Sequence, residues 1–148
     1  MRQNMERVLQ EGRRRERAQA RFYRRLCGAA EEAGDAAASE RLNALLADEQ
    51  HHVSRITARL LELGVVPDDD VPDREVEREP DLATWEVVAR ERESAEVEWY
   101  RKAVEETADR ATRDVLEDIL VSEEHHRDEL SGKWMSAAGR SEYRKEDR

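Results

Sequence analysis

All four histidines of this 148-residue chain lie in two short motifs, "DEQHH" at positions 48–52 and "SEEHH" at positions 122–126. In each motif a glutamate precedes a histidine by three residues, as Glu49-x-x-His52 and Glu123-x-x-His126. Positions i and i+3 share one face of an α-helix, so a carboxylate and an imidazole at this spacing can bind the same metal ion. The motifs therefore predict metal-ligand chemistry if both face the interior of a helical protein.

The phase of each motif relative to the apolar residues decides whether it faces the interior. Glu49 lies seven residues from both Leu42 and Ile56, so it belongs with His52 to the apolar stripe of its helix. The second motif falls in the stripe formed by Leu116, Ile119, Leu130 and Trp134. A lone E-x-x-H on a charged helix is usually a surface coincidence. Two copies in register, each on an apolar stripe, favour a buried site.

Carboxylates also interrupt the apolar stripes of two further helical stretches. Glu16 and Gln19 share a face with Met5, Val8, Gly12, Tyr23, Leu26 and Ala30. Glu93 and Glu96 share a face with Leu82, Trp85, Ala89, Tyr100 and Ala103. An unpaired buried carboxylate costs on the order of several kcal/mol, so these groups need compensation. Two divalent cations would balance four glutamates, and two neutral imidazoles would complete the ligand set.

The remaining two histidines are expected to play a different part. His51 and His125 precede the proposed ligands by about 100° of helical rotation. Asp48 could pair with His51 at the same i, i+3 spacing, but Ser122 stands at the matching position of the second motif. Only the Glu-x-x-His register is common to both halves. We therefore expect His51 and His125 either to support the ligands from outside or to be exposed.

The first half of the chain has the pattern of a helical hairpin. Gly34 and Asp35 interrupt the first helical stretch, and Asp35 or Ser39 can cap the second. The second stretch ends near Gly64. Positions 64–80 hold all three prolines and a run of acids, which indicates a linker.

The second half repeats the first. "ERAQARFYRRL" from Glu16 matches "ESAEVEWYRKA" from Glu93, and "LLADEQHH" matches "ILVSEEHH". A third helix is expected from position 81 or 82, a break at 107–112, and a fourth helix to Ala138, with a frayed tail at 139–148. Two hairpins joined by one long crossover predict an all-α, ferritin-like four-helix bundle that forms a single domain over residues 1–148.

Composition narrows the classes of function. The chain is 42% charged and 38% hydrophobic, with few glycines and prolines, which favours helices with narrow apolar stripes. Its net charge of −10 argues against general nucleic-acid binding. No apolar run is long enough to span a membrane, and no signal-peptide core is present, so we expect a cytoplasmic protein. The single cysteine, Cys27, is expected to be a small buried residue.

These segments resemble the ferritin-like diiron superfamily, and within it most closely the rubrerythrin-type proteins. The resemblance covers about positions 16–130 and rests on "ERAQARFY", "DEQHH", "ESAEVEWY" and "EEHH". It implies iron ligands at Glu16, Glu49, His52, Glu93, Glu123 and His126. It also implies an extra ligand at Glu96, one turn after Glu93, whose counterpart in the first half is Gln19.

Two features depart from the rubrerythrin pattern. The paired C-x-x-C motifs of a rubredoxin domain are absent, because the chain has only one cysteine. Glu16 and Glu49 are 33 residues apart, whereas Glu93 and Glu123 are 30 apart. The second hairpin therefore needs a shorter turn, which leaves Glu93 and Glu96 as alternatives for the primary ligand of the third helix.

The resemblance implies a non-haem diiron oxidoreductase that reduces H₂O₂ or O₂ and takes electrons from a separate donor protein such as a rubredoxin. A ferroxidase or iron-storage protein is an alternative, and an oxygenase of an organic substrate is a further one. The ligand set suits two irons but also manganese. We expect a homo-oligomer, at least a dimer.

Three residues are candidates for roles in the reaction itself. Glu96 would exchange with a histidine as the oxidation state of the nearer iron changes, as the rubrerythrin resemblance implies. Tyr23 and Tyr100 each follow a helix glutamate by two turns. Their hydroxyls could hydrogen-bond ligand carboxylates, or the rings could simply fill the core.

Overall fold

The computed structural model describes residues 2–69 and 81–133. It contains four α-helices and a terminal π-helical turn: α1 (Arg2–Ala33), α2 (Ala36–Glu62), α3 (Trp85–Glu106), α4 (Arg110–Asp128) and η1 (Glu129–Lys133). The described residues form no strand. The expected all-α, ferritin-like four-helix bundle is confirmed. No helix in the described ranges is long and apolar enough to cross a membrane.

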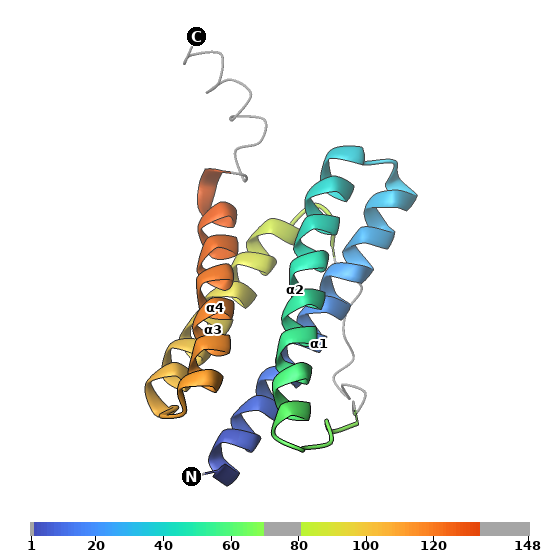
Figure 1. The fold of residues 1–148 in the computed structure, drawn as a ribbon. Helices are drawn as coiled ribbons and strands as arrows, with labels where there is room; N and C mark the ends of the chain where they lie inside the picture. The colour runs from blue at the N-terminus through green and yellow to red at the C-terminus, as the bar shows by residue number, and fades with distance from the viewer. Residues whose placement is uncertain (1, 70–80, 134–148) are drawn as a thin grey trace.

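Helices α1 and α2 form one antiparallel hairpin, and α3 and α4 form another (Figure 1). Gly34, at φ +70°, and Asp35 make the short turn between α1 and α2. The Asp35 carboxylate caps α2 by accepting a hydrogen bond from the Ala38 backbone N–H at 3.1 Å, and Asp109 caps α4 through the Thr112 N–H at 3.0 Å. The cap of α2 is therefore Asp35, one of the two expected candidates.

The second hairpin lies beside the first (Figure 1). Helix α2 ends near one end of the bundle and α3 begins near the other, as a long crossover requires. Gly64, at φ +75°, ends the α2 turn where expected, and its neighbour Val65 donates to the Leu60 carbonyl at 2.9 Å. Most of the expected linker lies outside the described residues.

The start of α3 is later than expected. The Asp81 carboxylate accepts a hydrogen bond from the Ala83 N–H at 2.9 Å, and the Asp81 carbonyl accepts one from the Thr84 N–H at 3.1 Å. These bonds close a turn, so the helix begins at Trp85. At the other end, α4 gives way at Glu129 to the wider turns of η1. The expected end at Ala138, the stripe residue Trp134 and the frayed tail lie outside the described residues.

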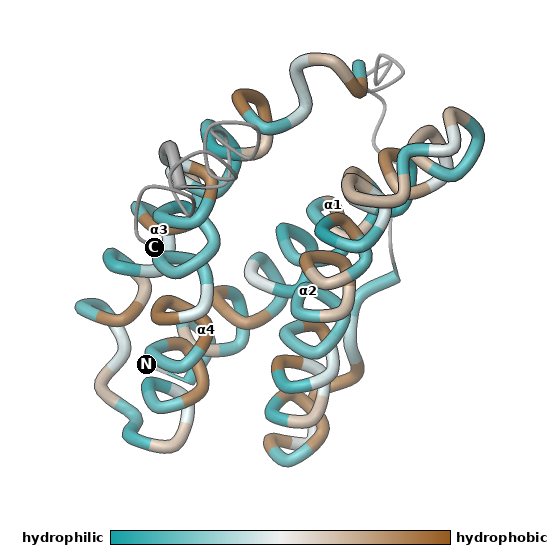
Figure 2. The backbone as a smooth tube through the Cα atoms, turned by 90° about the horizontal axis from the view of Figure 1, so that it is seen from above, coloured by the Kyte–Doolittle hydropathy of each residue, from teal (hydrophilic) through white to brown (hydrophobic). Residues whose placement is uncertain are grey.

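The apolar core is divided into two clusters. One contains Tyr23, Leu26, Cys27, Ala30, Ala38, Leu42, Leu45, Trp85, Ala89 and Leu130. The other contains Leu9, Ile56, Leu60, Tyr100, Ala103, Leu116 and Ile119. Hydrophobic and hydrophilic residues alternate along every helix, as narrow apolar stripes require (Figure 2). The stripe of each helix passes from one cluster to the other through a layer of buried polar residues.

Candidate metal centre

Six buried ligand-type side chains form the layer between the two apolar clusters. The four glutamates are fully buried, and the histidines are 3–4% exposed. We call this set the cage: Glu16 from α1, Glu49 and His52 from α2, Glu93 from α3, and Glu123 and His126 from α4. All six residues that the sequence predicts as the principal ligands thus face one another.

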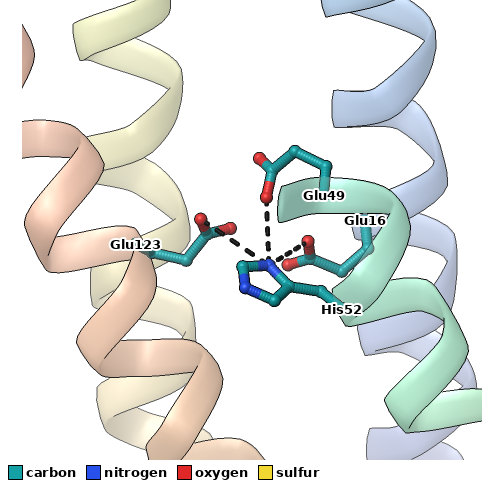
Figure 3. Close-up of side chains that lie close together, drawn as sticks. All are labelled: Glu16, Glu49, His52 and Glu123. Atoms are coloured by element: carbon teal, nitrogen blue, oxygen red, sulfur yellow. Dashed lines mark hydrogen bonds and ion pairs between the residues drawn. The ribbon is translucent and has the colours of Figure 1, made fainter. Parts of the chain in front are cut away.

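One half of the cage is centred on His52. Its Nδ1 atom lies 3.0 Å from Glu16 Oε1, 3.0 Å from Glu49 Oε1 and 3.9 Å from Glu123 Oε1. Figure 3 shows the three carboxylates converging on this ring nitrogen from three helices. Burial alone would lower the pKa of His52, but its hydrogen bond to Glu16 raises it. For Glu16 the effects are reversed. Burial alone would raise its pKa, but the hydrogen bond to His52 and the charge on that ring lower it.

The other half is centred on His126. Its Nδ1 atom lies 3.0 Å from Glu123 Oε1 and 3.6 Å from Glu93 Oε2. Its Nε2 atom lies 2.8 Å from Asp48 Oδ2, across the bundle on α2. Burial alone would lower the pKa of His126, but hydrogen bonds with Asp48 and the glutamates raise it far above its ordinary value. Asp48 therefore fixes the outer nitrogen of the ring while the inner nitrogen faces the cage.

The two halves share their central glutamates. Glu16, Glu49, His52 and Glu123 can each place one ligand atom within 4.8 Å of the others, and so can Glu49, Glu93, Glu123 and His126. The centroids of the two imidazole rings are 6.3 Å apart. Glu49 and Glu123 belong to both sets. This arrangement could hold two cations: Glu49 and Glu123 would be available to both, Glu16 and His52 to one, and Glu93 and His126 to the other.

The protein leaves part of the cage without hydrogen-bond partners. Three of its buried oxygens, Glu49 Oε2, Glu93 Oε1 and Glu123 Oε2, have no hydrogen-bond partner among the described residues. Burial and the neighbouring carboxylates raise the pKa of Glu49 and Glu123 well above the ordinary value. Orphaned buried carboxylate oxygens of this kind fit divalent cations, which would bind the free lone pairs and offset the charge.

Two tyrosines support the cage crosswise. The Tyr23 hydroxyl on α1 donates to Glu93 Oε2 on α3 at 2.6 Å, and the Tyr100 hydroxyl on α3 donates to Glu16 Oε2 on α1 at 2.7 Å. Burial and nearby carboxylates raise the pKa of both hydroxyls, so each stays a hydrogen-bond donor. The tyrosines thus both fill the core and orient carboxylates, and each serves the glutamate of the opposite hairpin.

The structure places Glu96 differently from the six cage residues. It is buried, at 7% exposure, but both of its oxygens accept hydrogen bonds from Arg15, at 3.0 and 3.1 Å. Its counterpart Gln19 accepts a 2.6 Å bond from Arg92 and lies with its amide nitrogen 3.5 Å from Glu93 Oε2. Glu96 does not belong to either ligand set of the cage.

The remaining sequence candidates fall outside the cage. His51 and His125 are exposed, and His125 Nε2 lies 3.4 Å from the carboxylate of Glu129, the first residue of η1. Cys27 is buried in an apolar cluster, as expected for a small core residue. The histidines of the two Glu-x-x-His motifs therefore face the other helices, whereas the adjacent histidines face solvent.

Three polar residues that touch the cage or its neighbours are not predicted from the sequence. The spacing of Asp48 pairs it with His51 on its own helix, whereas in the structure it contacts His126. Arg15 and Arg92 each directly precede the helix glutamate of their half, at Glu16 and Glu93. Aligning the two halves gives this arginine pair, but nothing in the alignment indicates that each side chain crosses to the other hairpin.

The fold and the shared carboxylates define a ferritin-like four-helix bundle with a candidate dimetal centre. Among solved structures, the bacterioferritin BfrA of Mycobacterium tuberculosis is similar, with a TM-score of 0.79 and 21% sequence identity over 95% of this chain and 91% of that chain. At this level of identity the similarity establishes the fold alone. No protein-family model and no curated protein matches the sequence. The closer resemblance to rubrerythrins stays a prediction.

Proposed function

We propose that this chain is a diiron ferroxidase that oxidises Fe²⁺ for iron handling or storage. The observation that carries the proposal is the pair of ligand sets sharing Glu49 and Glu123. The fold supports it, because a similar structure is described as a bacterioferritin. The sequence predicts this function as an alternative to peroxide reduction, and the similarity to a bacterioferritin supports the alternative.

The six cage residues would hold two irons, with Glu16 and His52 at one end and Glu93 and His126 at the other. A bound pair supplies two electrons, one from each Fe²⁺, to O₂ or H₂O₂. Four carboxylates match the charge of two divalent ions, and the same ligand set accepts Mn²⁺. The tyrosine hydroxyls orient Glu16 and Glu93 through hydrogen bonds of 2.7 and 2.6 Å.

A rubrerythrin-like peroxide reductase, with a separate protein as electron donor, is a second candidate. The position of Glu96 favours it, since this carboxyl group is buried one turn after Glu93. Burial raises the pKa of Glu96 to about 7 despite the opposing charge of Arg15. For Glu96 to replace a histidine ligand during turnover, it would first have to leave the Arg15 guanidinium.

Anaerobic titration with Fe²⁺, followed by rapid mixing with O₂ or H₂O₂, tests both functions. The ferroxidase proposal expects two Fe²⁺ per chain to be oxidised by O₂, and Glu49→Gln to slow this step at least about 100-fold, or about 2.7 kcal/mol of barrier. His51→Ala is the matched control on the same helix and should react like the wild type. Wild-type rates in Glu49→Gln would refute the site.

The variant Glu96→Gln separates the two candidates. If the protein is a peroxide reductase, this variant should keep two irons but react with H₂O₂ at least about tenfold more slowly, while its reaction with O₂ changes much less. If it is a ferroxidase, both rates should stay within about twofold of the wild type.

A further inference from the structure

Two arginines join α1 to α3 beside the cage in matching ways. Arg15 on α1 reaches Glu96 on α3, and its guanidinium carbon lies 5.2 Å from the centroid of the Trp99 ring. Arg92 on α3 reaches Gln19 on α1, and its guanidinium carbon lies 4.4 Å from the centroid of the Phe22 ring, which occupies the position equivalent to Trp99. The two halves thus build the same contact, but with a carboxylate on one side and an amide on the other.

The amide and the carboxylate cannot behave alike in these positions. Gln19 has an acceptor oxygen, which receives the Arg92 hydrogen bond, and donor hydrogens on the nitrogen that faces Glu93. Ionised Glu96 has only acceptors and would repel the cage carboxylates. Both of its oxygens are instead directed at Arg15, in the two parallel hydrogen bonds that a guanidinium makes with a carboxylate.

Glu96 lies beside the cage. It is buried on α3 one turn after Glu93, and its partner Arg15 directly precedes Glu16 on α1. The cage already contains four carboxylates for two divalent cations. A fifth carboxylate turned inward would add a ligand and a negative charge at the end of the cage that Glu16 occupies, whereas the Glu93 end has only the neutral Gln19, whose amide nitrogen faces Glu93.

The Arg15 side chain is itself held in place. Trp99 covers its guanidinium, and the carboxylate of Glu11, one turn earlier on α1, lies 3.8 Å away. Gly12 packs below the same ring: a Cβ at this position would be 3.4 Å from the Trp99 ring, an ordinary contact, and 3.3 Å from Ile56 Cδ1.

We propose that Arg15 is a positioning residue that holds Glu96 outside the dimetal cage, so that the cage binds its two cations with four carboxylates and the fifth is kept in reserve. The proposal rests on the cage of the proposed function, but not on the reaction carried out there. Release of Glu96 from Arg15 would convert the cage to a five-carboxylate site. Arg15 would therefore determine whether the metals bind to four carboxylates or to five.

Titration with Co²⁺ under anaerobic conditions tests this inference without turnover, because the visible absorption of Co²⁺ reports its coordination number. In the wild-type background Glu96→Gln should leave the visible spectrum unchanged and the Co²⁺ affinity within about twofold of the wild-type value. Arg15→Gln should weaken the visible bands, since a ligand is added, and tighten binding by about tenfold. The double variant Arg15→Gln/Glu96→Gln should return to the wild-type spectrum. Arg92→Gln, the matched control that faces neutral Gln19, should leave the spectrum unchanged.

Different results would overturn the proposal. If Glu96→Gln alone changes the Co²⁺ spectrum, Glu96 is already a ligand and Arg15 does not exclude it. A wild-type spectrum in a folded Arg15→Gln protein, as judged by circular dichroism, would show that Arg15 does not position Glu96. If Arg15→Gln does not fold, a changed spectrum in Glu96→Gln alone would still overturn the proposal. Failure of the proposed function would be seen separately, as absent oxidation of Fe²⁺ in a protein that still binds two Co²⁺.

Discussion

Removing bound metal should make the stability of the bundle fall as the pH rises. Burial and the neighbouring carboxylates raise the folded-state pKa of Glu49 and Glu123 well above 4.5, the ordinary value. The metal-free folded protein therefore holds protons on these groups that the unfolded chain has released. Stability from a raised pKa is fully present below the unfolded pKa and is lost as the pH rises through the folded one. The raised pKa values of His52 and His126 act in the same direction.

The groups with lowered pKa values act in a different range. The pKa of Glu16 lies below 4.5, and that of Asp48 lies below 3.8. Their contribution is present above those values and is lost only as the pH falls through the folded pKa. Between pH 5.5 and 7.5 the groups with raised pKa values consequently determine how the free energy of unfolding changes with pH.

The size of the effect follows from the number of protons retained. Each extra proton on the folded protein gives a slope of about 1.4 kcal/mol per pH unit, so two carboxyl protons give up to about 2.7. In a chain of this size 1 kcal/mol corresponds to about 3 °C in Tm. The Tm of the metal-free protein should therefore fall by about 4 to 8 °C per pH unit. Mn²⁺ at a hundredfold excess over Kd should add about 5 kcal/mol for two sites, because it binds the folded cage.

The assay is thermal unfolding followed by circular dichroism at pH 5.5, 6.5 and 7.5, with chelator or with Mn²⁺. The gain in Tm on adding Mn²⁺ should increase with pH, since metal and protons compete for the same oxygens. Glu49→Gln removes one titrating group and should reduce the metal-free slope by about 1.4 kcal/mol per pH unit. A Tm that rises with pH in chelator, or that ignores Mn²⁺ at every pH, would show that the cage carboxylates are hydrated.

Two further predictions concern the histidines. His126→Ala should lose stoichiometric binding of two Mn²⁺ per chain in equilibrium dialysis, whereas His125→Ala should keep it because that ring is exposed. Equal losses would contradict the assignment of His126, rather than His125, to the cage. Asp48→Asn should weaken the metal position served by His126 by about tenfold or more in a stepwise titration, since Asp48 fixes the outer nitrogen of that ring. Ser122→Ala, at the matching position of the other half, should leave both steps unchanged, and a loss there would argue against a special role for Asp48.

The sequence alone was sufficient for the bundle and for the six cage residues. The apolar stripe of a helix recurs with a period of 3.6 residues, so the phase of Glu49 relative to Leu42 and Ile56 could be worked out without coordinates. The repeat of the first half in the second then supplied the number of helices. Helix starts were less certain, because a side chain such as Asp81 can close a turn that competes with the first helical turn.

Contacts between the two hairpins were decided only by the tertiary structure. Tyr23 was expected beside a ligand carboxylate, but the sequence could not show that it would bond Glu93 of the opposite hairpin. Glu96 has the spacing of a ligand, yet its direction depends on Arg15, 81 residues earlier in the chain. Local periodicity specifies which face of a helix a residue occupies. It does not specify which side chain arrives from the neighbouring helix, because that depends on how the two hairpins pack.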